Sequence, residues 1–151
     1  MKKISLYVLL VLVFCNISFA DSLRVVDGDT IVLNGEKIRF SGIDTPELKQ
    51  TCMKGDEKIY CGRSAKKLLI KKIGNEIPKC ISEGKDAYKR TLAECFIHGE
   101  SLSVFLVRSG YAFAYRKYSD KFIKDEEFAK KNKLGMWAMK FQYPWDFRKT
   151  S

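Results

Sequence analysis

The most regular alternation of apolar and polar residues lies between residues 25 and 47. Two short apolar and β-branched runs, residues 30–33 and 38–40, are separated by Asn34-Gly35. An Asn-Gly pair between such runs is typical of a type I′ turn, because both central residues of that turn need a positive φ. The pattern therefore predicts a tight β-hairpin in which Asp29 pairs with Phe40.

Apolar spacing farther along the chain predicts three helices. Residues 62–73 and 100–109 carry apolar side chains at the spacing of one helix face. A third helix is predicted to begin at Ser119 or Asp120 and to end at Leu134, because a glycine follows.

The segments between these helices predict more β structure and one loop. Residues 48–60 are polar and indicate a loop. Short apolar runs at residues 76–82 and 92–97 predict a second antiparallel hairpin. The apolar tail, residues 141–147, is expected to pack onto the body of the domain.

The N-terminus has the pattern of a signal peptide. Lys2 and Lys3 precede an apolar run that is too short for a membrane span of roughly 20 residues. Ser18 and Ala20 are the small residues of a cleavage site, so we expect cleavage after Ala20 and export to the periplasm or the medium. Residues 21–151 then form one domain, for which we expect no membrane anchor and no lipidation.

The charge of the chain indicates a polyanionic partner. The formal net charge is +10, and loss of the two N-terminal lysines lowers it to +8. Nucleic acid, an anionic membrane surface or an acidic glycan would suit a compact basic domain. Charge alone does not choose among them.

Four cysteines remain after the predicted cleavage, and their spacing is not that of a zinc site. An even number in an exported chain indicates disulfides. If the second hairpin is centred near Ala87, Cys80 lies directly opposite Cys95. This register favours a Cys80–Cys95 bridge and leaves Cys52 to pair with Cys61.

Acidic residues flank the first hairpin on both sides. Asp27 and Asp29 precede it, Asp44 and Glu47 follow it, and Arg39 lies between them. Acids at strand ends are also ordinary turn formers. Hard oxygen ligands suit Ca²⁺ or Mg²⁺, however, and an arginine beside them suits a phosphate, so the pattern predicts a metal-dependent phosphodiesterase.

The single histidine narrows the choice of chemistry. His98 precedes a glycine and is expected to be a turn residue. Nucleases that need paired histidines and Ser-His-Asp hydrolases are therefore poorly supported.

Tyrosines mixed with basic residues supply candidate contacts for nucleic acid bases. Tyr88 and Arg90 lie near the predicted tip of the second hairpin. Tyr115 belongs to an aromatic alternation typical of a half-buried strand, and Tyr118 follows two basic residues. Exposed aromatic rings can stack with bases, at about 1–3 kcal/mol each.

Taken in order, these motifs resemble the staphylococcal nuclease (thermonuclease) family over nearly all of the mature chain. The matching segments are Val25–Thr30, Arg39, Asp44–Glu47, Tyr88–Arg90 and Leu134–Trp137. The resemblance implies an α+β, mainly β fold: an OB-fold-like five-stranded β-barrel with three α-helices. It also implies a Ca²⁺-dependent endonuclease that acts on DNA and RNA, with single-stranded substrate preferred and 3′-phosphate products.

The resemblance also implies a role for each site residue. Asp29, Asp44 and the Thr45 carbonyl would bind Ca²⁺, and Asp27 would support these ligands without binding the ion itself. Glu47 would position or deprotonate the attacking water. Arg39 and Arg90 would bind the scissile phosphate, while Tyr88 and one of Tyr115 or Tyr118 would contact the nucleotide.

Two points and one rival interpretation remain open. The family pattern has glycine at the position of Lys89. An ideal hairpin also places Asp29 and Arg39 on opposite faces, so a bulge or strong twist is needed to bring them together. A noncatalytic OB-fold that binds single strands is the alternative function, and we expect a monomer in either case.

Overall fold

The predicted hairpin forms the centre of a curled sheet. In this computed structural model, which describes residues 21–151, β2 (Thr30–Leu33) pairs with β3 (Glu36–Phe40) and Leu33 lies opposite Glu36. Asn34 and Gly35 both have positive φ, as the type I′ prediction requires. The predicted signal peptide lies outside the described residues.

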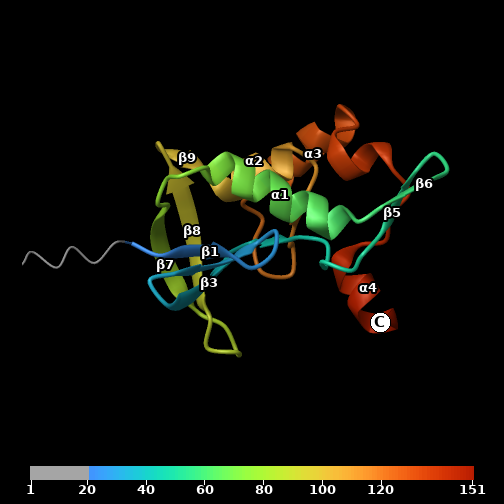
Figure 1. The fold of residues 1–151 in the computed structure, drawn as a ribbon. Coiled ribbons are helices and arrows are strands. Elements are labelled where there is room, and N and C mark those ends of the chain that lie inside the picture. The colour runs from blue at the N-terminus through green and yellow to red at the C-terminus, as the bar shows by residue number, and fades with distance from the viewer. Residues whose placement is uncertain (1–20) are drawn as a thin grey trace, which may run out of the picture.

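Within residues 21–151 this sheet has six strands, five of them in the order β1-β2-β3-β8-β7 and the sixth, β9, paired with β8. Strand β1 (Leu23–Val25) pairs with β2, and β8 (Thr91–Ile97) runs parallel to β3. Strand β7 (Lys79–Lys85) forms the other edge, and β9 (Glu100–Ser101) turns back along β8. The sheet curls into a half-barrel, which confirms the predicted α+β, OB-fold-like architecture (Figure 1).

Residues 21–151 contain four α-helices, so the prediction of three is wrong. Helices α1 (Cys61–Ile73), α2 (Leu102–Arg108) and α3 (Ile123–Lys131) lie together over one side of the sheet (Figure 1). Helix α4 (Pro144–Thr150) lies apart from them at the C-terminus. Sequence pattern missed α4 because it has only seven residues and follows an aromatic run that shows no helical spacing.

The main core lies between the sheet and the three grouped helices. Ile31 and Phe40 from the hairpin pack with Leu69 of α1 and Leu106 of α2, and all four are buried. Burying side chains of this size contributes about 1.5–3 kcal/mol each. This core holds the hairpin rigidly at the point where the acidic residues leave it.

Residues 48–60, predicted as a loop, contain a short hairpin of β5 (Cys52–Lys54) and β6 (Glu57–Ile59). The turn is made by Gly55 at φ +60°. The hairpin is mostly exposed, so it has no apolar alternation for a sequence pattern to detect.

Two predicted helices begin later than expected. Glu100 and Ser101 form β9, and the Ser101 hydroxyl accepts a hydrogen bond from the Val104 amide at the start of α2. Helix α3 begins at Ile123, because Ser119 instead accepts a hydrogen bond from the Lys121 amide in a preceding turn. It ends at Lys131, before the predicted Leu134.

Both predicted disulfides are present. Cys80 lies directly opposite Cys95 in the β7–β8 ladder, as the hairpin register predicted, and the two are bonded. Cys52 is bonded to Cys61, which ties the ends of the β5–β6 hairpin together. Strand β7 begins at Lys79, three residues later than predicted.

A second, aromatic cluster holds the C-terminal segment. Buried Phe113 lies on β10 (Phe113–Ala114), which pairs with β4 (Ile43–Asp44). Around it pack aromatic side chains from the short 3₁₀ helix η1 (Gly135–Ala138) and the tail, namely Trp137, Phe141, Tyr143 and Trp145. The predicted packing of the tail is confirmed. No helix among residues 21–151 has the length and apolar character needed to cross a membrane.

Candidate functional site

Arg39 brings two acidic side chains together beside the curled sheet. Its Nη1 donates to Asp29 Oδ1 at 2.6 Å, and its Nη2 donates to Asp44 Oδ1 at 2.8 Å. Both carboxylates are buried, whereas Arg39 is 17% exposed. Residues from the bend before β2, from β3 and from β4 therefore meet at one point.

The hairpin register alone would have kept Asp29 away from Arg39. The backbone does pair Asp29 with Phe40 as predicted, and the β2–β3 ladder contains no bulge. Asp29 lies in a bend just before β2, where its amide donates to Asp27 Oδ1 at 3.1 Å. Strand alternation does not govern a residue in such a bend, so its side chain can turn toward Arg39.

The Asp29 carboxylate is held by neutral donors as well. The amide and hydroxyl of Thr45 donate to Oδ2 at 2.9 and 3.0 Å, and the Thr30 hydroxyl donates to Oδ1. Burial raises the pKa of Asp29 to about 6, because Arg39 and Thr45 offset only part of the desolvation and Asp27 adds a like charge.

Asp44 is also bound by an arginine that the sequence did not indicate. Arg148 of α4 donates from Nη2 to Asp44 Oδ2 at 2.7 Å and from Nη1 to Oδ1 at 3.2 Å. The same Nη1 donates to Glu47 Oε1 at 2.9 Å. Arg148 thus joins the Asp44 carboxylate to Glu47. No signal in the sequence could have paired residues about a hundred positions apart.

Glu47 lies on a loop whose backbone is clamped. Buried Gln50 donates its amide to the Glu47 carbonyl and accepts from the Glu47 amide with its side-chain oxygen. The Gln50 side chain also donates to the Gln142 carbonyl at 2.6 Å. Gly62 of α1 lies against the same backbone. The Glu47 side chain itself remains 43% exposed, so water reaches its carboxylate.

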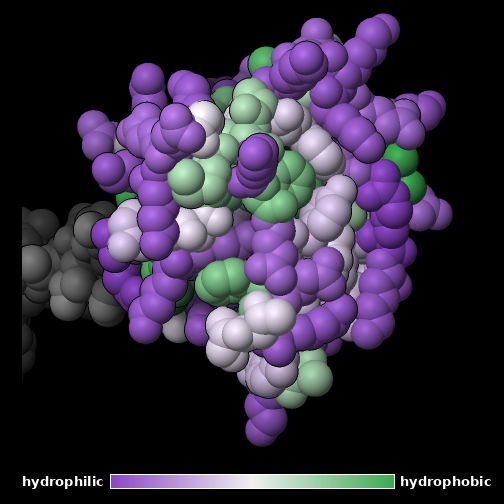
Figure 2. Space-filling model, turned by 90° about the vertical axis from the view of Figure 1, so that its right-hand side faces the viewer, coloured by the Kyte–Doolittle hydropathy of each residue, from purple (hydrophilic) through white to green (hydrophobic). Residues whose placement is uncertain are grey.

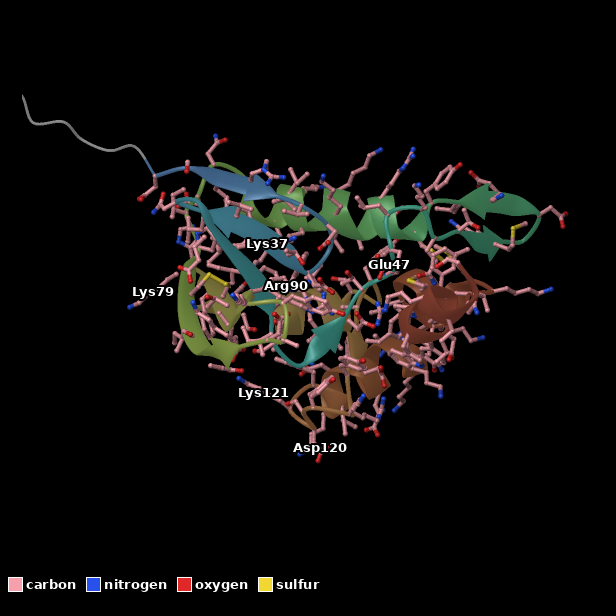
Figure 3. The ribbon with its side chains drawn as sticks, turned by 90° about the horizontal axis from the view of Figure 1, so that it is seen from below. Lys37, Glu47, Lys79, Arg90, Asp120 and Lys121 are labelled. Carbon is pink, nitrogen blue, oxygen red and sulfur yellow. A yellow bond between two sulfur atoms is a disulfide. The ribbon has the colours of Figure 1, made fainter. Side chains whose placement is uncertain are left out.

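Arg90 and Tyr88 lie on the tip of the β7–β8 hairpin. Arg90 pairs with Asp86 of the same turn, at 2.6 Å, and not with the carboxylates of the site. Tyr88 is 82% exposed. Figure 3 shows Arg90 near the centre of the view from below, with Glu47 between it and the C-terminal segment. Lys89, which lies between Tyr88 and Arg90 in the sequence, has φ +63°, a left-handed conformation that favours glycine.

The two tyrosines of the aromatic alternation join the C-terminal cluster. Tyr115 contacts Tyr118 edge to face, and its other neighbour is Trp145 of α4, whose ring is parallel to it. Trp145 in turn stacks on Tyr143. Tyr118, Tyr115, Trp145 and Tyr143 thus form an aromatic row. Tyr118 is 69% exposed, so its ring is the one in this row that is open to a ligand. The face of the molecule on the α4 side is largely hydrophilic, with apolar side chains gathered in its middle (Figure 2).

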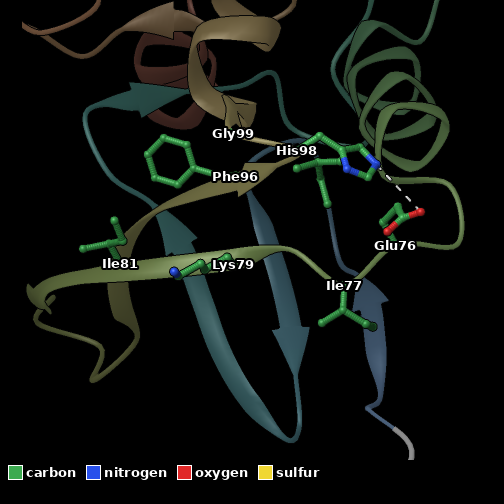
Figure 4. A pocket seen from close by; sticks show the side chains of 8 residues that line it. Glu76, Ile77, Lys79, Ile81, Phe96, His98 and Gly99 are labelled. Atoms are coloured by element: carbon green, nitrogen blue, oxygen red, sulfur yellow. Dashed lines mark ion pairs between the residues drawn. The ribbon is translucent and has the colours of Figure 1, made fainter.

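A pocket elsewhere on the surface contains none of the predicted site residues. It lies at the C-terminal end of β8 and is lined by residues such as Ile77 and Phe96. His98 there points to Glu76 at 3.8 Å (Figure 4). His98 forms the turn between β8 and β9 with φ +50°, as predicted.

The donors at the acidic site have the chemistry that Ca²⁺ prefers. Asp29 and Asp44 supply carboxylate oxygens, and Thr45, whose carbonyl is the third predicted ligand, contacts Asp29 through its amide and hydroxyl. Among residues 21–151, no three His, Cys, Asp or Glu side chains are arranged to hold a metal ion. A cation here would therefore rely on two carboxylates, one carbonyl and water, which Ca²⁺ accepts because its coordination is flexible.

The match to a known family decides what kind of domain this is. The model of the staphylococcal nuclease homologue family matches residues 37–139, more than half of the chain. The chain belongs to the staphylococcal nuclease family. The matched range includes Arg39, Asp44, Glu47 and Arg90, whereas Asp29 and Arg148 lie outside it.

Several relatives are named as nucleases. The chain is 33% identical to "Endonuclease YncB" of Bacillus subtilis, over 76% of its length and 59% of the relative. It is 29% identical to an "Uncharacterized endonuclease" of Haemophilus influenzae, over 76% and 64%. It is 28% identical to "Staphylococcal-like nuclease CAN1" of Arabidopsis thaliana, over 76% and 33%. The chain thus spans less than two thirds of the length of each of these relatives.

Proposed function

We propose that this chain is a Ca²⁺-dependent endonuclease that hydrolyses phosphodiester bonds in DNA and RNA. We further propose that it prefers single-stranded substrate and leaves 3′-phosphate ends. The observation that carries the proposal is the contact of Arg39 with both Asp29 and Asp44, at 2.6 and 2.8 Å, in a chain of this family.

Asp29, Asp44 and the Thr45 carbonyl are the residues that would hold the cation. When bound, Ca²⁺ would supply positive charge that offsets the negative charge developing on the phosphate. Thr45 and Asp27 support this role by fixing Asp29, the first through the Asp29 carboxylate and the second through its amide. Their hydrogen bonds orient the carboxylate before any ligand arrives.

The proposed role of Arg39 is to bind the scissile phosphate. A guanidinium has five N–H donors, and Arg39 uses two of them on Asp29 and Asp44. The remaining donors and the fixed charge suit a phosphate whose negative charge grows in the transition state. Arg90, which Asp86 orients at the hairpin tip, is proposed as the second phosphate-binding arginine.

Glu47 is proposed as the residue that positions and deprotonates water. Its exposed carboxylate accepts a hydrogen bond from Arg148, and its backbone is fixed by Gln50. A general base must be reachable by water and yet held in place. Glu47 meets both conditions.

Exposed tyrosines account for the proposed preference for single strands. Tyr88 and Tyr118 offer rings that are 82% and 69% exposed. A base can stack on such a ring only when it is unpaired. The two rings lie on separate parts of the chain, the β7–β8 hairpin tip and the segment after β10, so each is a candidate contact for a different nucleotide.

The decisive experiment measures release of acid-soluble nucleotides from denatured DNA and from RNA, with Ca²⁺ and with chelator. Wild type should cleave both only with Ca²⁺, and Glu47→Gln should be at least about a hundredfold slower, since general acid–base catalysis contributes about 10²–10⁴-fold. Glu57→Gln, which changes an exposed acid on β6, is the matched control and should cleave at the wild-type rate.

Other results would select a different function. Tight binding of denatured DNA without cleavage under every condition would identify a noncatalytic OB-fold binding protein. Full activity of Glu47→Gln would refute the base assignment. End-labelling of the products tests the predicted 3′-phosphate.

We also propose that the chain is exported, on the basis of the sequence pattern of residues 1–20. N-terminal sequencing of the protein recovered from outside the cytoplasm should begin at Asp21. Recovery of the intact N-terminus in the cytoplasmic fraction alone would contradict this.

A further inference from the structure

Arg148 occupies the part of Asp44 that a cation would need. Within residues 21–151, Asp44 Oδ1 accepts hydrogen bonds from Arg39 and Arg148, and Oδ2 accepts one from Arg148, at 2.7 Å. A carboxylate oxygen has two acceptor sites. On Oδ1 both are used, and on Oδ2 the positive charge of Arg148 lies beside the remaining site. The arginine therefore competes with a divalent cation for Asp44, both for acceptor sites and through repulsion between the two positive charges.

The contacts of Arg148 are those of a counter-ion for two acids. Its guanidinium spans Asp44 and Glu47. Without it, Asp44 would have to share the single charge of Arg39 with Asp29. A guanidinium is protonated at any ordinary pH. Arg148 thus remains a cation under all conditions in which the acids are charged.

Arg148 is also placed so that it can leave. It is 38% exposed, whereas Arg39 is 17% exposed and holds both buried carboxylates. Its helix is anchored three residues earlier by Trp145, which stacks on Tyr143 and Tyr115. The side chain can therefore rotate into solvent while the backbone of α4 stays in place.

We propose that Arg148 is an exchangeable counter-ion of the metal site, which neutralises Asp44 and Glu47 in the metal-free protein and is displaced from Asp44 when a divalent cation binds. This inference rests on the proposed function for the identity of the cation. It adds a residue from beyond the range that the family model matches. The role is that of a positioning residue, since Arg148 acts through Asp44 and Glu47.

The test is calcium binding measured by calorimetry on the folded, disulfide-bonded protein, without nucleic acid. Arg148→Gln removes the competitor, so it should bind Ca²⁺ roughly tenfold more tightly than wild type, which corresponds to about 1.4 kcal/mol. Lys149→Gln is the control, because it removes the same charge from the next position, where the lysine's one ion pair within the described part of the chain is with Asp146 of its own helix. Its affinity for Ca²⁺ should match that of wild type or be slightly higher.

A second variant and a second readout guard against a folding defect. Arg148→Lys keeps the charge but loses the two-pronged contact with Asp44, so its calcium affinity should lie between those of wild type and Arg148→Gln. Saturating Ca²⁺ should raise the melting temperature of Arg148→Gln more than that of wild type, because the cation no longer has to displace a bound arginine.

Equal or weaker calcium binding by Arg148→Gln would overturn the inference, and would show that the arginine only attaches α4 to the domain. Absence of calcium binding in wild type and both Arg148 variants would also overturn it. The proposed function fails separately: if affinity rises as expected but no variant or wild type cleaves nucleic acid, the counter-ion role stands and the nuclease role does not.

Discussion

Gly62 of α1 is the residue whose replacement best tests how the catalytic loop is held. A Cβ at this position would lie 1.9 Å from the Glu47 carbonyl oxygen and 2.7 Å from that of Pro46, where ordinary contact begins near 3.4 Å. Both neighbours are backbone atoms, which cannot rotate away. Gly62→Ala therefore requires the loop that bears Glu47, or the start of α1, to move by about 1.5 Å.

The sign of the stability change makes this prediction sharp. In a helix without such neighbours, alanine stabilises relative to glycine by as much as about 1 kcal/mol. Overpacking costs about 1–3 kcal/mol, occasionally more, and here it acts on backbone that cannot relax by a rotamer change. We expect Gly62→Ala to lower the free energy of unfolding by about 2 kcal/mol.

The rate of cleavage should also fall, even for protein that is fully folded, because misplacement of a catalytic group by about 1 Å can cost roughly a hundredfold in rate. Urea unfolding of the disulfide-bonded protein and cleavage of denatured DNA at a temperature where the variant is fully folded measure the two effects. Lys67→Ala, at an exposed position of the same helix, is the control and should change neither by much. A Gly62→Ala variant as stable and active as wild type would refute the clash, and with it the claim that α1 positions Glu47.

Two further predictions concern the second hairpin and the buried acid. Lys89→Gly should raise the free energy of unfolding by about 0.5–1 kcal/mol, because Lys89 has φ +63° and a left-handed conformation is costly for residues with a Cβ. Lys89→Ala removes the same charge but keeps the strain, so thermal unfolding should show no gain; equal gains for both would point to charge instead. The Asp29 pKa of about 6 lies above the unfolded value near 3.8, so the folded, metal-free protein retains a proton that the unfolded chain loses between about pH 4 and pH 6. The contribution of Asp29 to stability therefore falls over that window, by on the order of 2–3 kcal/mol. Asp29→Asn cannot ionise, so in urea unfolding with chelator its stability relative to wild type should improve by that amount from pH 4 to pH 7; a difference that is constant with pH would contradict the raised pKa.

Local sequence determined the features that depend on neighbouring residues. Asn34-Gly35 specifies the turn, and the turn sets the register that pairs Asp29 with Phe40. The second hairpin placed Cys80 opposite Cys95 in the same way. The order and spacing of the acidic motifs and Arg39 along the chain were enough to indicate the family, and with it the barrel fold. Turn chemistry and strand alternation are short-range effects, so a sequence can display them directly.

Only the tertiary structure decided how the acids are held and which cations hold them. Strand alternation predicts Asp29 and Arg39 on opposite faces of the hairpin. The bend that begins at Asp27 turns the Asp29 side chain toward Arg39 instead. Gln50 reaches the backbone of Gln142, and Arg148 reaches Asp44 and Glu47, across about a hundred residues. Such contacts exist only because aromatic packing around Phe113 brings the tail back to β4. Hydrophobic burial of this kind is not directional, so the sequence shows that the tail will pack but not which charged side chain it delivers to the site.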